Sequence, residues 1–241
     1  PAPADKCPGM LGLASIHANG IDNTPEPAAG GELYTRAAKL GKASAMLELG
    51  YQHAIGEIVP KSIDKAAQWY LNAGKEGVAD GFFRAGNLHF RHDSPLHSYD
   101  EAHRLYTLAM NDGNADAHAA LANMYHGGYG VAVNLQRAFS LYIKASELGN
   151  LDASLTAGYF LRDGLGVEID LAKAAALMRK AADGGNTAAM VDLGKVLQAG
   201  GPGLGKADLA SAHDWFERAA EAGNFSGMVD LGSLYYHGRG V

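Results

Sequence analysis

Glycine recurs along this chain with a period of 36 residues, and no other feature constrains the fold as strongly. The recurring glycines are Gly41, Gly77, Gly113, Gly149 and Gly185, and Gly223 follows after a gap of 38 residues. A period of this length is typical of stacked helical hairpins, because one hairpin cannot bury its apolar face without a neighbour. The period therefore predicts an all-α solenoid, and no segment shows the alternation typical of a β-strand.

Small residues occupy fixed positions in each repeat, counted from the recurring glycine as position 1. Positions 5 and 10 carry only alanine or glycine, as at Ala45 and Gly50. Alanine also recurs at positions 26 and 33, with a large apolar residue such as Trp69, Leu105 or Trp215 at position 29. These spacings of three, four and seven residues give one apolar face of an α-helix. Each repeat is thus predicted to hold two closely packed helices, with both tryptophans in the core.

The register of the repeat predicts where the helices begin and end. The first helices are predicted at 43–54, 79–90, 115–126, 151–162, 187–198 and 225–236, and the second helices at 62–75, 98–111, 134–147, 170–183 and 208–221. Glycine-rich turns such as 127–131 and 164–167 connect them, and Asn134 and Asp170 occupy the N-cap positions of second helices. A Pro-rich leader covers 1–9. A single solenoid domain covers 10–241, with repeats at 10–40, 41–76, 77–112, 113–148, 149–184, 185–222 and a partial one at 223–241.

Composition and charge narrow the classes of function. With 47% apolar residues among 241, the chain can bury a sizeable core. Its net charge of −6 offers no broad basic surface, so nucleic-acid binding is not expected. The sequence also lacks a run of about 18 apolar residues, which a transmembrane helix needs. The single cysteine, Cys7, excludes an intrachain disulfide.

The repeats share short motifs of the form Ala-x-x-x-Leu-Gly-x-x-Tyr, Gly-x-Gly-Val and Ala-Ala-x-x-Gly. Good instances lie within Ala189–Gly194, Gly164–Val167 and Asp214–Gly223. These motifs resemble the Sel-1-like repeat family, a relative of the tetratricopeptide repeats. The resemblance implies an α/α right-handed superhelix that binds a protein or peptide partner on its concave face, as a non-catalytic bacterial adaptor or scaffold. The second repeat departs from the motifs, because residues 91–98 replace its glycine-rich turn.

Two narrower functions are alternatives to a general adaptor. The resembled family includes immunity proteins that neutralise secreted lipase toxins. An envelope glycan-binding protein is the other alternative, for which Tyr51 and Tyr159 are the supporting aromatic residues. The Pro-Ala leader resembles the start of a processed exported protein, so a periplasmic or secreted location is predicted, with a cytoplasmic one as the alternative.

Histidines concentrate at His89, His92, His97 and His103. Imidazole ligates zinc, so a metal-dependent enzyme built on this stretch is a third alternative. Against it, His89 holds position 13, where Tyr125 lies in a sister repeat, and we interpret it as a packed ring between two helices. Motifs for a serine nucleophile, a zinc protease or a phosphate loop are absent from the sequence. The chain is therefore predicted to be no enzyme and to need no cofactor or metal.

Positions 4, 8 and 11 share one face of each first helix, opposite the small residues. Stacking of the repeats is expected to align them as a polar stripe on the inner wall of the solenoid. The candidate partner-binding residues are Glu48, Tyr51, Arg84, Asn87, Asn123, Tyr159, Asp192 and Lys195. Asparagine amides can both donate to and accept from a peptide backbone, and tyrosine is enriched at binding hot spots. The loop at 91–98 and the helix at 225–236, which no second helix follows, are further candidate surfaces.

Overall fold

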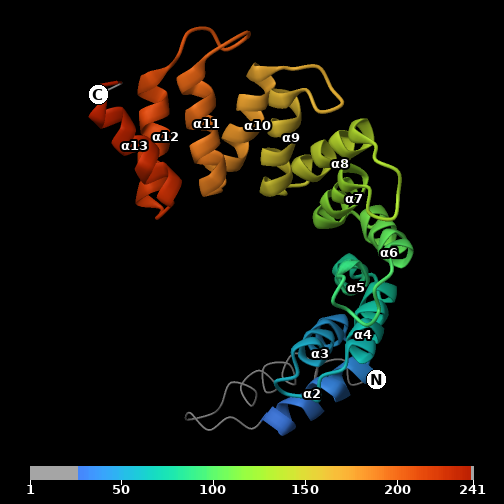
Figure 1. Cartoon of the computed structure of the whole chain (residues 1–241). Coiled ribbons are helices and arrows are strands. Elements are labelled where there is room, and N and C mark those ends of the chain that lie inside the picture. The colour runs from blue at the N-terminus through green and yellow to red at the C-terminus, as the bar shows by residue number, and fades with distance from the viewer. Residues whose placement is uncertain (1–26, 240–241) are drawn as a thin grey trace, which may run out of the picture. The chain divides into compact units, whose positions relative to one another are not determined.

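The computed structural model of the chain describes residues 27–239, which form twelve α-helices in chain order (Figure 1). The predicted leader, Cys7 and the first part of the leading repeat lie outside the described residues. Two compact units divide the chain, unit 1 up to Ala117 and unit 2 from His118. Within residues 27–239, no helix combines the length and the apolar character that a membrane crossing requires.

The helices of both units follow the predicted register. Unit 1 holds α2 (Pro27–Lys39), α3 (Ala43–Ile55), α4 (Ile63–Lys75), α5 (Ala79–Phe90) and α6 (Tyr99–Asn111), and α7 (Ala115–Gly127) spans the boundary. Unit 2 holds α8 (Leu135–Glu147), α9 (Leu151–Asp163), α10 (Leu171–Asp183), α11 (Thr187–Ala199), α12 (Leu209–Glu221) and α13 (Phe225–Tyr236). In each unit consecutive helices pack on one another, which confirms the all-α hairpin solenoid.

The recurring glycine ends one hairpin and starts the next. Gly113 has a φ of 82°, a left-handed conformation that favours glycine. Its N–H donates to the carbonyl of Met110, and the N–H of Asn114 donates to the carbonyl of Ala109, both at 3.0 Å, which closes the end of α6. The Asn114 side chain then accepts from the N–H of Ala117 at 2.8 Å and caps α7. Sequence reasoning assigned caps only to the second helices and missed this one.

The predicted N-caps of the second helices are confirmed. The side-chain oxygen of Asn134 accepts from the backbone N–H of Arg137 at 2.9 Å, and that of Asp170 accepts from Lys173 at the same distance. The glycine-rich turns before them contain left-handed residues, such as Gly164 with a φ of 71°. These turns return the chain so that the second helix packs against the first.

Glycine at position 10 makes room for a ring from the second helix of the same repeat. A Cβ atom on Gly86 would lie 2.6 Å from the Tyr106 ring, and one on Gly194 would lie 2.5 Å from the Phe216 ring. Both rings are fully buried. Trp215 is buried beside Phe216, while Trp69 packs half-buried against the core of unit 1, so the core interpretation of both tryptophans is confirmed.

Candidate functional site

The candidate residues of unit 1 lie on α3 and α5, and most of them are already engaged. Tyr51, the aromatic residue among them, is 45% exposed. Glu48 accepts a hydrogen bond from Gln52 at 2.7 Å. The Arg84 guanidinium donates to Asp80 at 2.6 Å on the same exposed helix face. Unit 1 therefore offers one open ring and a set of locally paired charges.

Two asparagines of the predicted stripe are held by tyrosines from the second helices. The Tyr106 hydroxyl donates to the side-chain oxygen of Asn87 at 2.7 Å, within unit 1. The Tyr142 hydroxyl donates to the side-chain oxygen of Asn123 at 2.5 Å, within unit 2. Each amide oxygen thus accepts one hydrogen bond inside the protein, which orients the amide and leaves its N–H groups and one oxygen lone pair for a partner.

In unit 2 the stripe is a ladder of pairs between successive repeats. The Tyr159 hydroxyl on α9 donates to the Asp192 carboxylate on α11, and Lys195 on α11 lies 3.2 Å from the Asp230 carboxylate on α13. We call Tyr159, Asp192, Lys195 and Asp230 the polar ladder. Each pair joins position 11 of one repeat to position 8 of the next, so the ladder links the first helices of successive repeats.

The electrostatics of the ladder centre on Tyr159. Burial raises the pKa of the Tyr159 hydroxyl, and its hydrogen bond to Asp192 raises that pKa further. The Arg162 guanidinium lies 4.8 Å from the centre of the same ring, within the range of a cation–π contact. The hydroxyl proton is therefore held in the bond to Asp192, and the exposed part of the ring and its Arg162 neighbour are what a partner can contact.

Tyr159 and Asp192, both predicted to lie on the stripe, are in contact in the structure. Lys195 lies on the same helix as Asp192, three residues further on. The structure adds three residues that the predicted set lacked, namely Asp230, Tyr106 and Tyr142. Tyrosine recurs at position 30 at a spacing of 36 residues, and this signal could have revealed its shared role.

The candidate histidines of unit 1 separate into two environments. The His89 ring nitrogen Nδ1 lies 2.8 Å from the carbonyl of Leu96, and the His53 Nδ1 lies 3.0 Å from the carbonyl of Pro60. Both rings thereby close the connection between the two helices of their repeat, which confirms the packed-ring interpretation of His89. His103 is half-buried on α6.

The other two histidines lie in the aberrant connection between α5 and α6. The ring centres of His92 and His97 are 4.6 Å apart, and the Tyr99 hydroxyl lies 2.6 Å from Nε2 of His92. The two exposed imidazoles and the half-buried Tyr99 ring at the start of α6 form a small aromatic cluster, in the repeat that lacks the glycine-rich turn.

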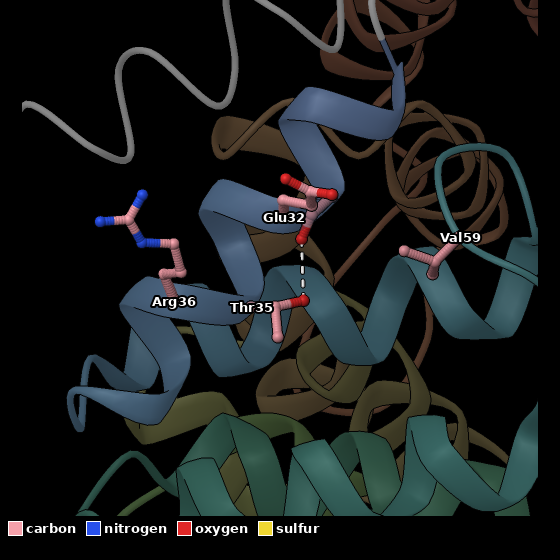
Figure 2. Close-up of a pocket in the computed structure, with 5 residues that line it drawn as sticks. Glu32, Thr35, Arg36 and Val59 are labelled. Carbon is pink, nitrogen blue, oxygen red and sulfur yellow. Dashed lines mark hydrogen bonds between the residues drawn. The ribbon is translucent and has the colours of Figure 1, made fainter.

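A cavity of about 360 Å³ lies between α2 and the loop after α3, lined by Gly31, Glu32, Thr35, Arg36 and Val59 (Figure 2). Gly31 lies on its wall, close to the loop after α3. A Cβ atom there would lie 3.0 Å from Val59. Figure 2 shows Arg36 extending away from Val59, so the charged groups do not converge on one point of the cavity. The polar ladder is the better organised candidate for binding.

The buried tyrosines give a prediction for alkaline unfolding. Burial raises the pKa of Tyr142 from its ordinary 10.0 to about 12. A raised pKa means that the neutral form stabilises the fold fully below pH 10, and this contribution is lost as the pH rises from 10 towards 12. Stability measured by urea unfolding is expected to fall over this window, and less steeply in Tyr142→Phe. Tyr236→Phe changes a ring that is 86% exposed, so the dependence of its stability on pH should match that of the wild type. Equal pH dependence in all three proteins would contradict the assignment of this effect to Tyr142.

Comparison with known proteins gives the family. A model described as Sel1 repeat matches residues 8–42, 43–78, 115–150, 154–186, 187–224 and 226–241. The matched ranges leave out 79–114, the repeat in which residues 91–98 replace the glycine-rich turn. None of the curated proteins compared with the chain matches it.

Solved structures agree with this match. A protective antigen present in uropathogenic Escherichia coli strains, which displays an SLR fold, is 28% identical, with a TM-score of 0.79 over 95% of this chain. The match covers 49% of the antigen, so this chain spans about half its length. A Sel1 repeat protein from Oxalobacter formigenes is 27% identical, with a TM-score of 0.75, covering 90% of this chain and 88% of that protein. An immunity protein from Pseudomonas aeruginosa shares the fold at 19% identity, with a TM-score of 0.55, covering 94% and 86%.

Proposed function

The chain belongs to the Sel1 repeat family, and we propose that it is a non-catalytic scaffold that binds a protein or peptide partner through the exposed face of its first helices. Repeat solenoids of this kind are suited to protein binding, because each repeat adds one strip to a continuous surface.

The polar ladder of unit 2 is the observation that carries the proposal. Its side chains are already paired, by the contacts from Tyr159 to Asp192 and from Lys195 to Asp230. Side chains held before binding lose less entropy on association, so their polar contacts add more affinity than those of mobile side chains. Lys195 is half-exposed and supplies N–H donors, as does the amide of Asn123, so a partner with exposed carbonyl or carboxylate oxygens fits best.

Catalysis has little support in the described residues. Lys180 and Ser146 lie 3.3 Å apart, which is the pairing of a serine nucleophile with a base. Ser146 is only 2% exposed, however, and its hydroxyl lies 2.6 Å from that of Ser154. Because a substrate cannot reach it, we assign this cluster to the packing of α8, α9 and α10.

Affinity capture from the native source tests the proposal. The bait is the intact chain, compared with Asn87→Ala, Asn123→Ala and Tyr159→Ala combined in one variant. The matched control is Lys144→Ala with Glu147→Ala, which removes an exposed ion pair from a second helix. The partner is expected to be lost only by the first variant, provided that thermal unfolding shows both variants folded. A partner retained by the first variant and lost by the control would contradict the proposal.

Two narrower forms of this function stay predictions with separate tests. Neutralisation of a lipase toxin would protect growth when the toxin is expressed, and glycan binding would give a signal on a glycan array. The predicted periplasmic or secreted location is checked by fractionation of the native cells.

A further inference from the structure

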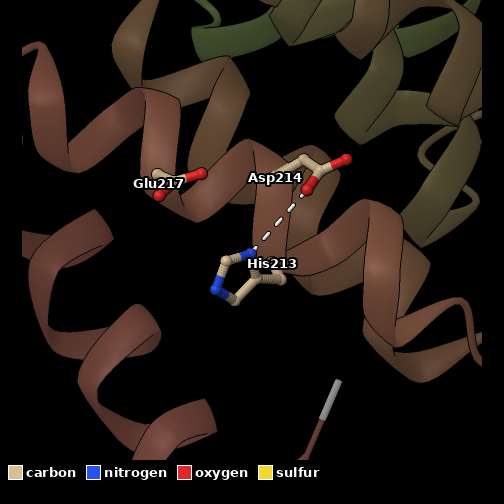
Figure 3. Close-up of side chains that lie close together, drawn as sticks. All are labelled: His213, Asp214 and Glu217. Atoms are coloured by element: carbon tan, nitrogen blue, oxygen red, sulfur yellow. Dashed lines mark ion pairs between the residues drawn. The ribbon is translucent and has the colours of Figure 1, made fainter. Parts of the chain in front are cut away.

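One helix of unit 2 carries three potential metal ligands outside the polar ladder. His213, Asp214 and Glu217 lie on α12, and one ligand atom from each lies within 4.8 Å of the others (Figure 3). The His213 nitrogen Nδ1 is 3.7 Å from a carboxylate oxygen of Asp214. The His213 side chain is 15% exposed, whereas that of Asp214 is 78% exposed. One side of the cluster is therefore fixed in the protein and the other side is open to water.

The orientation of the His213 ring is set from the opposite side. Its Nε2 lies 3.1 Å from the Tyr235 hydroxyl on α13, and the two rings pack edge to face with centres 5.4 Å apart. The tautomer decides the direction of this bond. A ring protonated on Nε2 donates to the Tyr235 oxygen and leaves the Nδ1 lone pair on the side of Asp214, whereas a ring protonated on Nδ1 accepts from the Tyr235 hydroxyl. In the Nε2–H tautomer the Nδ1 lone pair and the Asp214 carboxylate are facing acceptors, and a metal ion between them would bind both.

The arrangement has the elements of a metal site. A ligating histidine commonly donates its second N–H to an oxygen that fixes the tautomer, which is the place that Tyr235 holds. Imidazole with two carboxylates suits Zn²⁺, and water can complete the coordination on the exposed side.

The sister helix that also has histidine at this repeat position lacks the other ligands. On α6 the corresponding residue is His103, followed by Arg104 and, four residues on, Thr107. The Arg104 guanidinium and the Thr107 hydroxyl take the places of the two carboxylates, so α6 offers no carboxylate ligand to a metal. Histidine with carboxylates one and four residues later is thus specific to α12 among the described second helices.

We propose that His213, Asp214 and Glu217 bind a divalent zinc-like cation at the surface of unit 2. Binding at Nδ1 fixes the Nε2–H tautomer and strengthens the hydrogen bond to Tyr235, so the cation joins α12 more firmly to α13. This site is independent of the partner-binding face, since it lies on a second helix.

Zinc titration of the full chain tests the site. Because the exposed pair His92 and His97 could take zinc as well, all proteins carry His92→Gln and His97→Gln. Calorimetry is expected to show one equivalent of Zn²⁺, bound at least tenfold more weakly by Glu217→Gln. Glu221→Gln is the matched control, since it removes a carboxylate from the same helix outside the cluster and should bind as the parent does.

Nitrogen NMR of the histidine rings supplies the readout that separates a metal from a proton. Zinc is expected to shift the His213 Nδ1 resonance and to leave the proton on Nε2. A protonated Nδ1 at saturating zinc would overturn the proposal, and so would equal affinity in Glu217→Gln and the parent.

Discussion

Replacing Gly81 with alanine is expected to destabilise unit 1 by about 3 kcal/mol, the upper end for overpacking a tight contact. Gly81 begins the packed face of α5 at position 5. A Cβ atom there would lie 2.5 Å from the backbone nitrogen of Gly74 and closer still to the carbonyl oxygen of Tyr70. Both are backbone atoms of α4 and cannot rotate aside, so α5 would have to move. Urea unfolding of the full chain, followed by circular dichroism, measures the loss.

Gly232→Ala is the matched control for this prediction. Gly232 lies within α13 at position 10, and a Cβ atom there would meet nothing within 4 Å. Alanine should therefore stabilise the helix by up to about 1 kcal/mol, the difference in helix propensity between the two residues. If Gly81→Ala and the wild type unfold at the same midpoint urea concentration, α4 and α5 do not approach each other as closely as the structure shows.

The helices were predictable because the repeat encodes local packing. Helices α3 to α13 begin and end within one residue of the predicted bounds. The information comes from residues whose role is fixed by geometry, such as the left-handed Gly113 at a hairpin junction and the small Gly81 where two helices touch. Such requirements recur in every repeat and are therefore visible as a period.

For the candidate site, the sequence predicted which face of the first helices carries it, but not how its side chains pair. Position counting found Tyr159, Asp192 and Lys195, because residues three and four apart share one side of a helix. It could not find their pairing, since whether a hydroxyl reaches the next repeat depends on how one hairpin is rotated against its neighbour. The candidate metal ligands at His213 escaped for another reason. They occur in one repeat only, and a period reveals nothing that is not repeated.

Replacing Tyr106 with alanine is the second large effect, an expected loss of about 4 kcal/mol. Tyr106 is 1% exposed and its ring lies against Gly86, Phe83 and Phe90, so its removal leaves a cavity in unit 1. Tyr106→Phe keeps the ring and removes only the hydrogen bond to Asn87, so about 1 kcal/mol is expected. Urea unfolding distinguishes the two, and equal losses would show that the hydroxyl rather than the ring holds the hairpin together.

A double-mutant cycle with Gly86 tests whether the glycine exists to admit the ring. In the wild type, Gly86→Ala should cost about 2 kcal/mol, because its Cβ would lie 2.6 Å from the ring of Tyr106. In the Tyr106→Ala background that obstacle is gone, and the helix propensity of alanine should make the same change stabilising by up to about 1 kcal/mol. A reversal of sign, equal to a coupling of about 3 kcal/mol, requires direct contact between the two residues. Additive effects would mean that the recurring glycine at position 10 serves the helix itself, and the explanation of the repeat by ring packing would fail.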